Sequence, residues 1–74
     1  MGRQAFVVTV MGEMDEHLRN EFEHLEIAIE HGVTRLRVVS VDPSVLHGVL
    51  NRIHLLGLEL LDAHQVDPGS PGEW

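Results

Sequence analysis

The segment from Asp42 to Leu61 constrains the fold more than any other part of this 74-residue chain. Asp42 is a residue type that favours the N-cap of a helix, and Pro43 suits the first helical position, where an N–H is not needed. Gly57 then supplies a helix stop before a new apolar run. The segment therefore predicts a helix followed by a strand, and the buried face of the helix consists of Leu46, Val49, Leu50, Ile53 and Leu56.

Three stretches have the composition and period of β-strands. In Gln4–Met11, alternate side chains would face opposite sides of a strand, and several of them are β-branched. Arg35–Val41 follows the same pattern. Leu58–Val66 begins as a strand and becomes polar after Leu61. We expect these three stretches to pair in one sheet.

A further helix is predicted between the first two strands. Asp15 can cap its start, and His31-Gly32-Val33 has the form of a glycine stop. Apolar residues recur between them at spacings of four, three and four, which places them in one stripe: Leu18, Phe22, Leu25 and Ile29.

Together these elements predict an α/β fold (an α+β sandwich) of order β-α-β-α-β, with a three-stranded sheet and two helices on one face. Residues 1–66 form the single domain, and residues 67–74 (D-P-G-S-P-G-E-W) are predicted to be a disordered tail. The predicted core consists of Phe6, Val8, Val10, Leu18, Phe22, Leu25, Ile29, Leu36, Val38, Leu46, Leu50 and Ile53.

The small size of the chain favours self-association. A core in so short a chain contributes only about 3–5 kcal/mol, and domains of this size commonly add disulfides, metals or partner subunits. There is no cysteine, and three strands leave an open sheet edge. We therefore expect a homo-oligomer, most simply a dimer joined through a sheet edge or through helix faces.

The composition also argues against several classes of function. The net charge is −7 and the five arginines are scattered, so nucleic-acid binding is not expected. No apolar run is long enough to span a membrane, and the N-terminus lacks the features of a signal peptide, which predicts a cytoplasmic protein. No nucleophile with its base, oxyanion donor or phosphate-binding loop is recognisable, so we expect neither catalysis nor a cofactor.

The second half of the chain resembles the first strand–helix–strand of ACT domains, small ferredoxin-like modules that bind amino acids and regulate enzymes. The matching positions are Asp42, Pro43, Val45, Leu46, Val49, Leu50, Gly57, Leu58 and Leu60. The first half resembles the later part of such a domain, so the two halves would occur in reversed order and share Arg35–Val41. The resemblance implies an amino-acid-like ligand or a regulated protein as partner, and a ligand site at Val41, Asp42, Pro43, Ser44 and Val45. The alternative is ordinary helix capping by Asp42 and Pro43.

A second resemblance involves the start of the chain. F-V-V-T-V-M-G-E-M-D followed by an acidic helix is similar to the beginning of STAS domains, which act in anti-sigma antagonist pathways. That resemblance implies Ser44 as a phosphorylation site. A structural or protein–protein interaction module with the same fold is the remaining alternative, because it needs no ligand.

Histidines recur every seven residues at His17, His24 and His31. On one helix they would form a row beside the apolar stripe, which suggests a pH-sensitive surface. The rise over seven helical residues is about 10.5 Å, so neighbouring members cannot share a metal ion, and no metal site is expected. The alternative is a partly solvated flank of the core.

Overall fold

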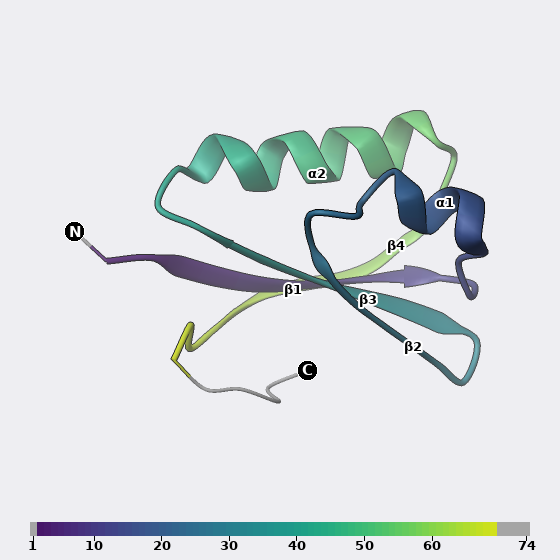
Figure 1. The fold of residues 1–74 in the computed structure, drawn as a ribbon, viewed down its shortest axis with the longest axis horizontal. Coiled ribbons are helices and arrows are strands. Elements are labelled where there is room, and N and C mark those ends of the chain that lie inside the picture. The colour runs from purple at the N-terminus through teal and green to yellow at the C-terminus, as the bar shows by residue number, and fades with distance from the viewer. Residues whose placement is uncertain (1, 70–74) are drawn as a thin grey trace.

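The computed structural model describes residues 2–69, and within them the chain forms a four-stranded sheet with two helices on one face (Figure 1). The elements in chain order are β1 (Gln4–Met11), α1 (Glu16–Asn20), β2 (Glu26–Glu30), β3 (Val33–Ser40), α2 (Pro43–Leu55) and β4 (Leu60–Val66).

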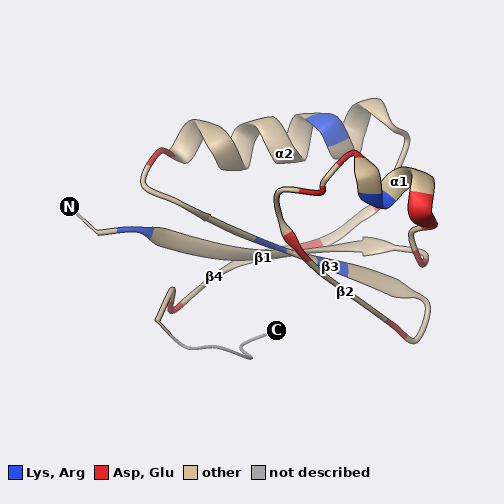
Figure 2. Cartoon of the chain, viewed as in Figure 1, with Lys and Arg blue, Asp and Glu red and all other residues tan. Residues whose placement is uncertain are grey.

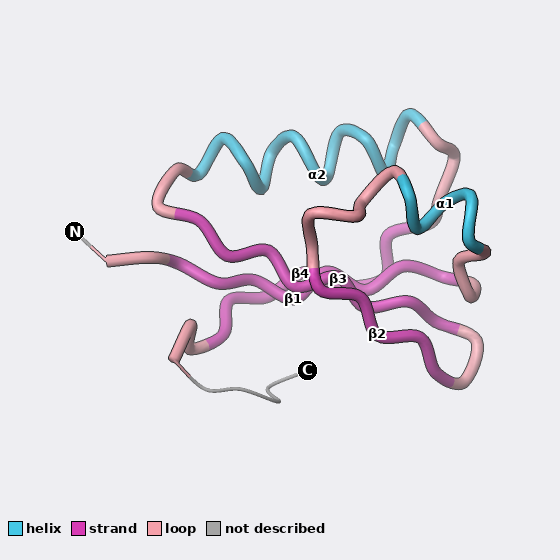
Figure 3. Tube along the Cα trace, in the orientation of Figure 1, coloured by secondary structure: helices cyan, strands magenta, loops and turns pink. Residues whose placement is uncertain are grey.

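The strands lie in the order β2-β3-β1-β4, and every neighbouring pair is antiparallel. The order β-α-β-β-α-β with this sheet is the split β-α-β, or ferredoxin-like, connectivity. The expected α+β class and the placement of both helices on one face are confirmed, whereas the expected three strands are in fact four (Figure 3).

The additional strand corrects the predicted helix between Asp15 and His31. Asp15 caps α1 as expected, accepting from Leu18 N at 2.8 Å, but the helix ends at Asn20. Glu26–Glu30 is β2, in which Ile27 and Ile29 alternate toward the helices. The alternation has a period of two, which the apparent helical stripe concealed.

A two-residue turn, and not a helix stop, follows β2. Glu30 pairs with Val33, and between them His31 has φ of 50° and Gly32 has φ of 82°. Two consecutive positive φ angles characterise the type I′ turn, whose twist suits a β-hairpin. The chain therefore reverses at His31-Gly32 and continues directly into β3.

The core lies between the helices and the sheet face that carries Val8, Val10, Leu36 and Val38. Of the predicted core, these four residues, Phe22 and Ile53 are buried, and the other six are partly buried. Thr34 is the one buried polar residue recorded in the described part of the chain, and its hydroxyl is fully used. It donates to Gly12 O at 2.7 Å and accepts from Met14 N at 3.0 Å, which fixes the loop after β1.

The opposite sheet face, here called the open face, carries the alternate residues of each strand. Arg37 on β3 lies beside Val7 on β1, and its Nη2 donates to Pro68 O at 3.1 Å. The turn at Asp67–Gly69 therefore returns to this face. The predicted tail from 67 to 74 lies largely outside the described residues, which end at Gly69. No helix in the described part of the chain is long and apolar enough to cross a membrane.

Candidate functional site

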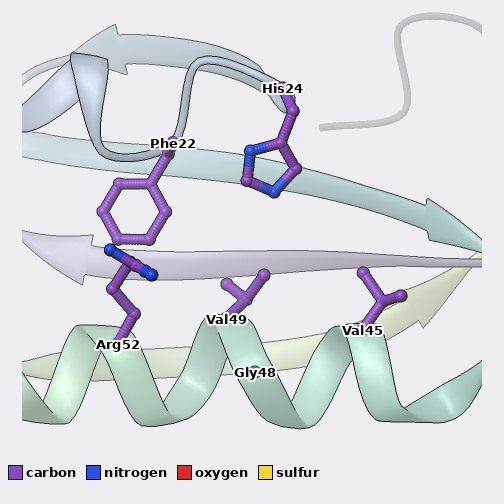
Figure 4. A pocket seen from close by; sticks show the side chains of 6 residues that line it. All are labelled: Phe22, His24, Val45, Gly48, Val49 and Arg52. Atoms are coloured by element: carbon purple, nitrogen blue, oxygen red, sulfur yellow. The ribbon is translucent and has the colours of Figure 1, made fainter.

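A pocket of about 210 Å³ lies between α2 and the segment that joins α1 to β2 (Figure 4). The side chains of Val45, Val49 and Arg52 point from α2 toward Phe22 and His24 on the joining segment. Its lining residues are Phe22, His24, Val45, Gly48, Val49 and Arg52.

The joining segment places Phe22 and His24 because α1 ends early. Phe22 N donates to Arg19 O at 3.0 Å, and Leu25 N donates to Phe22 O at 2.9 Å, so the chain continues in tight turns after α1. Phe22 is fully buried in the core, whereas His24 remains exposed. The pocket consequently has an apolar base and a polar rim.

The start of α2 is fixed by Asp42. The Ser44 backbone N–H donates to Asp42 Oδ1 at 2.9 Å, and this hydrogen bond holds the pKa of Asp42 below its ordinary value of 3.8. Asp42 N in turn donates to Ser40 Oγ at 3.0 Å. Val45 and Val49 follow this cap on the same helix and line the pocket.

Arg52 connects α2 to the end of α1 at the rim. Its Nη1 donates to Glu21 Oε1 at 2.7 Å, and both side chains are partly exposed. Of the two partners, only Arg52 lines the pocket. Gly48 leaves one wall without a side chain, because a Cβ built there meets nothing within 4 Å.

The ligand segment predicted from the ACT resemblance is mainly exposed. Val41, Asp42, Pro43 and Ser44 lie at the surface, and only Val45 lines the pocket. The remaining lining residues come from α2 and from the segment after α1, whose proximity depends on the tertiary fold. Apolar positions on α2 were recognisable in the sequence, but their facing residues Phe22 and His24 were assigned to a helix.

The predicted row of histidines on one helix is wrong. His17 lies on α1, His24 in the joining segment and His31 in the hairpin turn. His17 borders a shallow hollow with Asp15, Glu16 and Asn20. Among residues 2–69 there is no group of three or more metal-ligating side chains that could hold an ion.

Acidic positions on β2 and basic positions on β3 lie beside one another in the sheet (Figure 2), and the strand register places their side chains on the open face. Arg37 Nη1 lies 3.0 Å from Glu26 Oε1, and Arg35 pairs with Glu30. The Arg37 side chain is only one-tenth exposed, and its Nε has no hydrogen-bond partner among the described residues. These pairs join β2 to β3.

The fold and the pocket define a small α+β domain of ferredoxin-like connectivity with a pocket on one side of α2. Residues 5–64 match the family described as Domain of unknown function (DUF8691), and the chain belongs to that family. No curated protein and no solved structure matches the chain.

Proposed function

We propose that this chain is a small, non-catalytic regulatory domain that binds an amino-acid-like ligand in the pocket on α2 and acts as a homo-oligomer. The observation that carries the proposal is an apolar pocket base directly beside Arg52 and His24. A volume of about 210 Å³ is smaller than the roughly 300–1,000 Å³ of pockets for drug-sized ligands. The ligand is therefore a small molecule.

The lining residues indicate the chemistry of the ligand. Phe22, Val45 and Val49 provide apolar contacts for an aliphatic or aromatic side chain. The Arg52 guanidinium has five N–H donors and uses Nη1 toward Glu21, so it can also donate to a ligand carboxylate. His24 adds an imidazole to the lining. An α-amino acid with an apolar side chain has both the apolar group and the carboxylate that these residues can contact.

The ACT resemblance supports the same class of function. Modules of that type are ferredoxin-like, and this chain has that order of strands and helices. The order is the ordinary one with a β2–β3 hairpin, so the reversed halves and the shared strand that the resemblance implied are wrong. The ligand segment implied by the resemblance contributes Val45 to the pocket. The remainder of that segment acts as the cap of α2.

Thermal-shift measurements with the twenty amino acids test the proposal. A ligand that binds only the native state raises the melting temperature, and we expect the largest rise with apolar amino acids. Gly48→Leu fills the open wall of the pocket and should abolish the rise. Asn51→Leu is the matched control, because Asn51 is exposed on the same helix outside the pocket. An absence of any shift with the wild-type chain would refute ligand binding by this pocket.

A structural or protein–protein interaction module is the second candidate. It is favoured by four exposed leucines around the end of α2 and the start of β4, namely Leu55, Leu56, Leu60 and Leu61. This candidate predicts self-association without any thermal shift from amino acids. Because both candidates predict self-association, the thermal shift with amino acids separates them.

A further inference from the structure

β4 is the more exposed edge of the sheet. It pairs with β1 on one side, and in the described part of the chain no strand pairs with its other side. Six of its seven residues are exposed. Alternate residues of such a strand direct backbone N–H and C=O groups outward, where another strand can pair with them.

A carboxylate and an imidazole on β4 lie on the open face of the sheet. Asp62 is opposite Thr9 and His64 is opposite Val7, which places both side chains on the face away from the helices. His64 Nδ1 lies 2.6 Å from Asp62 Oδ2 in the same chain. The imidazole has a second nitrogen, Nε2, that can meet another carboxylate.

Pairing of two β4 strands about a two-fold axis has a restricted set of registers. The axis stands perpendicular to the sheet, so residues that oppose each other must lie on the same face. The register centred on Ala63 overlaps all seven residues of β4. In this register Asp62 lies directly opposite the partner's His64, and His64 opposite the partner's Asp62. The register with complete overlap is therefore also the one that places each carboxylate opposite an imidazole that can donate a hydrogen bond to it.

At the other edge of the sheet, pairing of two β2 strands would place like charges opposite each other. Full overlap of two β2 strands is centred on Ala28 and places Glu26 opposite the partner's Glu30, with both carboxylates on the open face. Like charges directly opposite each other destabilise a strand pair. Pairing of β2 with β4 of another copy would generate open-ended chains and not a closed dimer.

We infer that two copies of this chain pair through β4 in the Ala63-centred register, forming a continuous antiparallel sheet with Asp62–His64 pairs across the two-fold axis. Leu60 and Leu61, two of the four exposed leucines, belong to β4 itself, so the same association brings exposed apolar residues to the paired edge. Figure 3 shows β4 at the border of the sheet. The inference specifies the interface of the homo-oligomer proposed above and does not require the ligand.

Cysteine cross-linking tests the register because the chain has no cysteine of its own. In the proposed register, Ala63→Cys places the thiol of one chain opposite the same thiol of the partner chain, at a separation compatible with a disulfide. Ala28→Cys, at the centre of β2, is the matched control. We expect a disulfide-linked dimer to form with Ala63→Cys at micromolar concentration and not with Ala28→Cys. Equal cross-linking of the two variants, or none with Ala63→Cys, would overturn the inference.

Charge reversal tests the cross-strand pairs. His64→Glu places like charges opposite each other at two symmetric positions, and we expect sedimentation to show a dimer dissociation constant raised roughly two- to thirtyfold. Adding Asp62→Lys to His64→Glu places opposite charges across the axis and should return the constant to the wild-type range. Both side chains are about half exposed, so the fold should tolerate these changes. A double variant no better than His64→Glu would contradict the pairing.

These experiments separate the interface from ligand binding. The pocket is on the helix side of the sheet, so His64→Glu should retain any amino-acid-induced thermal shift. If the wild-type chain sediments as a monomer but still shows an amino-acid-induced thermal shift, the β4 interface is refuted and ligand binding by the pocket is supported. If the chain dimerises but Ala63→Cys does not cross-link, the β4 interface is refuted and the copies associate through another surface.

Discussion

β2 and β4 both form an edge of the same sheet, yet their side chains are anchored differently. Ile27 and Ile29 of β2 pack against the core, and its two glutamates pair with arginines on β3. β4 has six exposed residues out of seven, including Leu60 and Leu61. The difference teaches that the two edges of one sheet can be protected unequally. Charged side chains and core packing hold β2 in place, whereas the outer edge of β4 is exposed.

The largest expected effect concerns how much the side chains of each edge strand contribute to the free energy of unfolding. Ile27→Ala removes side-chain atoms that pack on the core and should lower the free energy of unfolding by about 2 kcal/mol. Leu61→Ala, on the exposed edge, should change it by less than about 0.5 kcal/mol. Urea denaturation of the two variants at low protein concentration measures the difference. Equal losses would mean that the edges are equally anchored.

The hairpin turn that carries β2 gives the next largest effect. Gly32 has φ of 82°, so Gly32→Ala forces a left-handed conformation and should cost about 1–2 kcal/mol. Because a Cβ at this position meets no atom within 4 Å, the cost is conformational and not steric. His31→Asn, which suits positive φ, is the control and should be neutral or slightly stabilising. A stabilised Gly32→Ala variant would exclude the turn.

Removing the charges of β2 should make the two edges more alike. The double variant Glu26→Gln and Glu30→Gln eliminates like-charge repulsion while keeping side chains that can accept from Arg35 and Arg37. We expect Ala28→Cys to cross-link more in this background than in the wild-type chain. Because exposed ion pairs contribute less than about 1 kcal/mol, the fold should persist. If cross-linking is unchanged, packing alone must protect β2.

The smallest expected effect concerns the N-cap of α2, which should influence the stability of the fold without influencing dimerisation. The folded-state pKa of Asp42 is lowered by the Ser44 N–H, so its contribution is present above pH 3.8 and is lost as pH falls through the lower folded-state pKa. Asp42→Ala should therefore lower the melting temperature at pH 7, and the difference from wild type should narrow at pH 3. Dimerisation through β4 should be unaffected. A difference independent of pH would contradict the role of the carboxylate.

Much of the fold followed from local sequence signals. The strands β1 and β3 and the helix α2 agree with the expected segments because their period, cap and stop point to one structure. The segment after α1 differs, since Leu18, Phe22, Leu25 and Ile29 satisfy helical spacing although Glu26–Glu30 alternates as a strand. Burial of Ile27 and Ile29 against the core decides between the two patterns, and that packing is tertiary.

The candidate site was less predictable than the fold. Val45 was recognised from the helix start, but Arg52 and His24 become neighbours only when the segment after α1 crosses α2. Their separation along the chain gives no motif with a fixed spacing. The edge pairing of β4 likewise depends on the sheet order, which local sequence does not specify.

The sheet order also has a consequence for the way the chain folds. β1 lies in the interior of the sheet, where it pairs with β3 and with the last strand, so that Ala5 meets Val66 almost a full chain length away. Only the β2–β3 hairpin joins strands that are adjacent in sequence, and hairpins form within about 1–10 μs. During synthesis β1 therefore emerges before both of its partners, β3 and β4. Its valine-rich segment is the part of the nascent chain most in need of protection from misassociation.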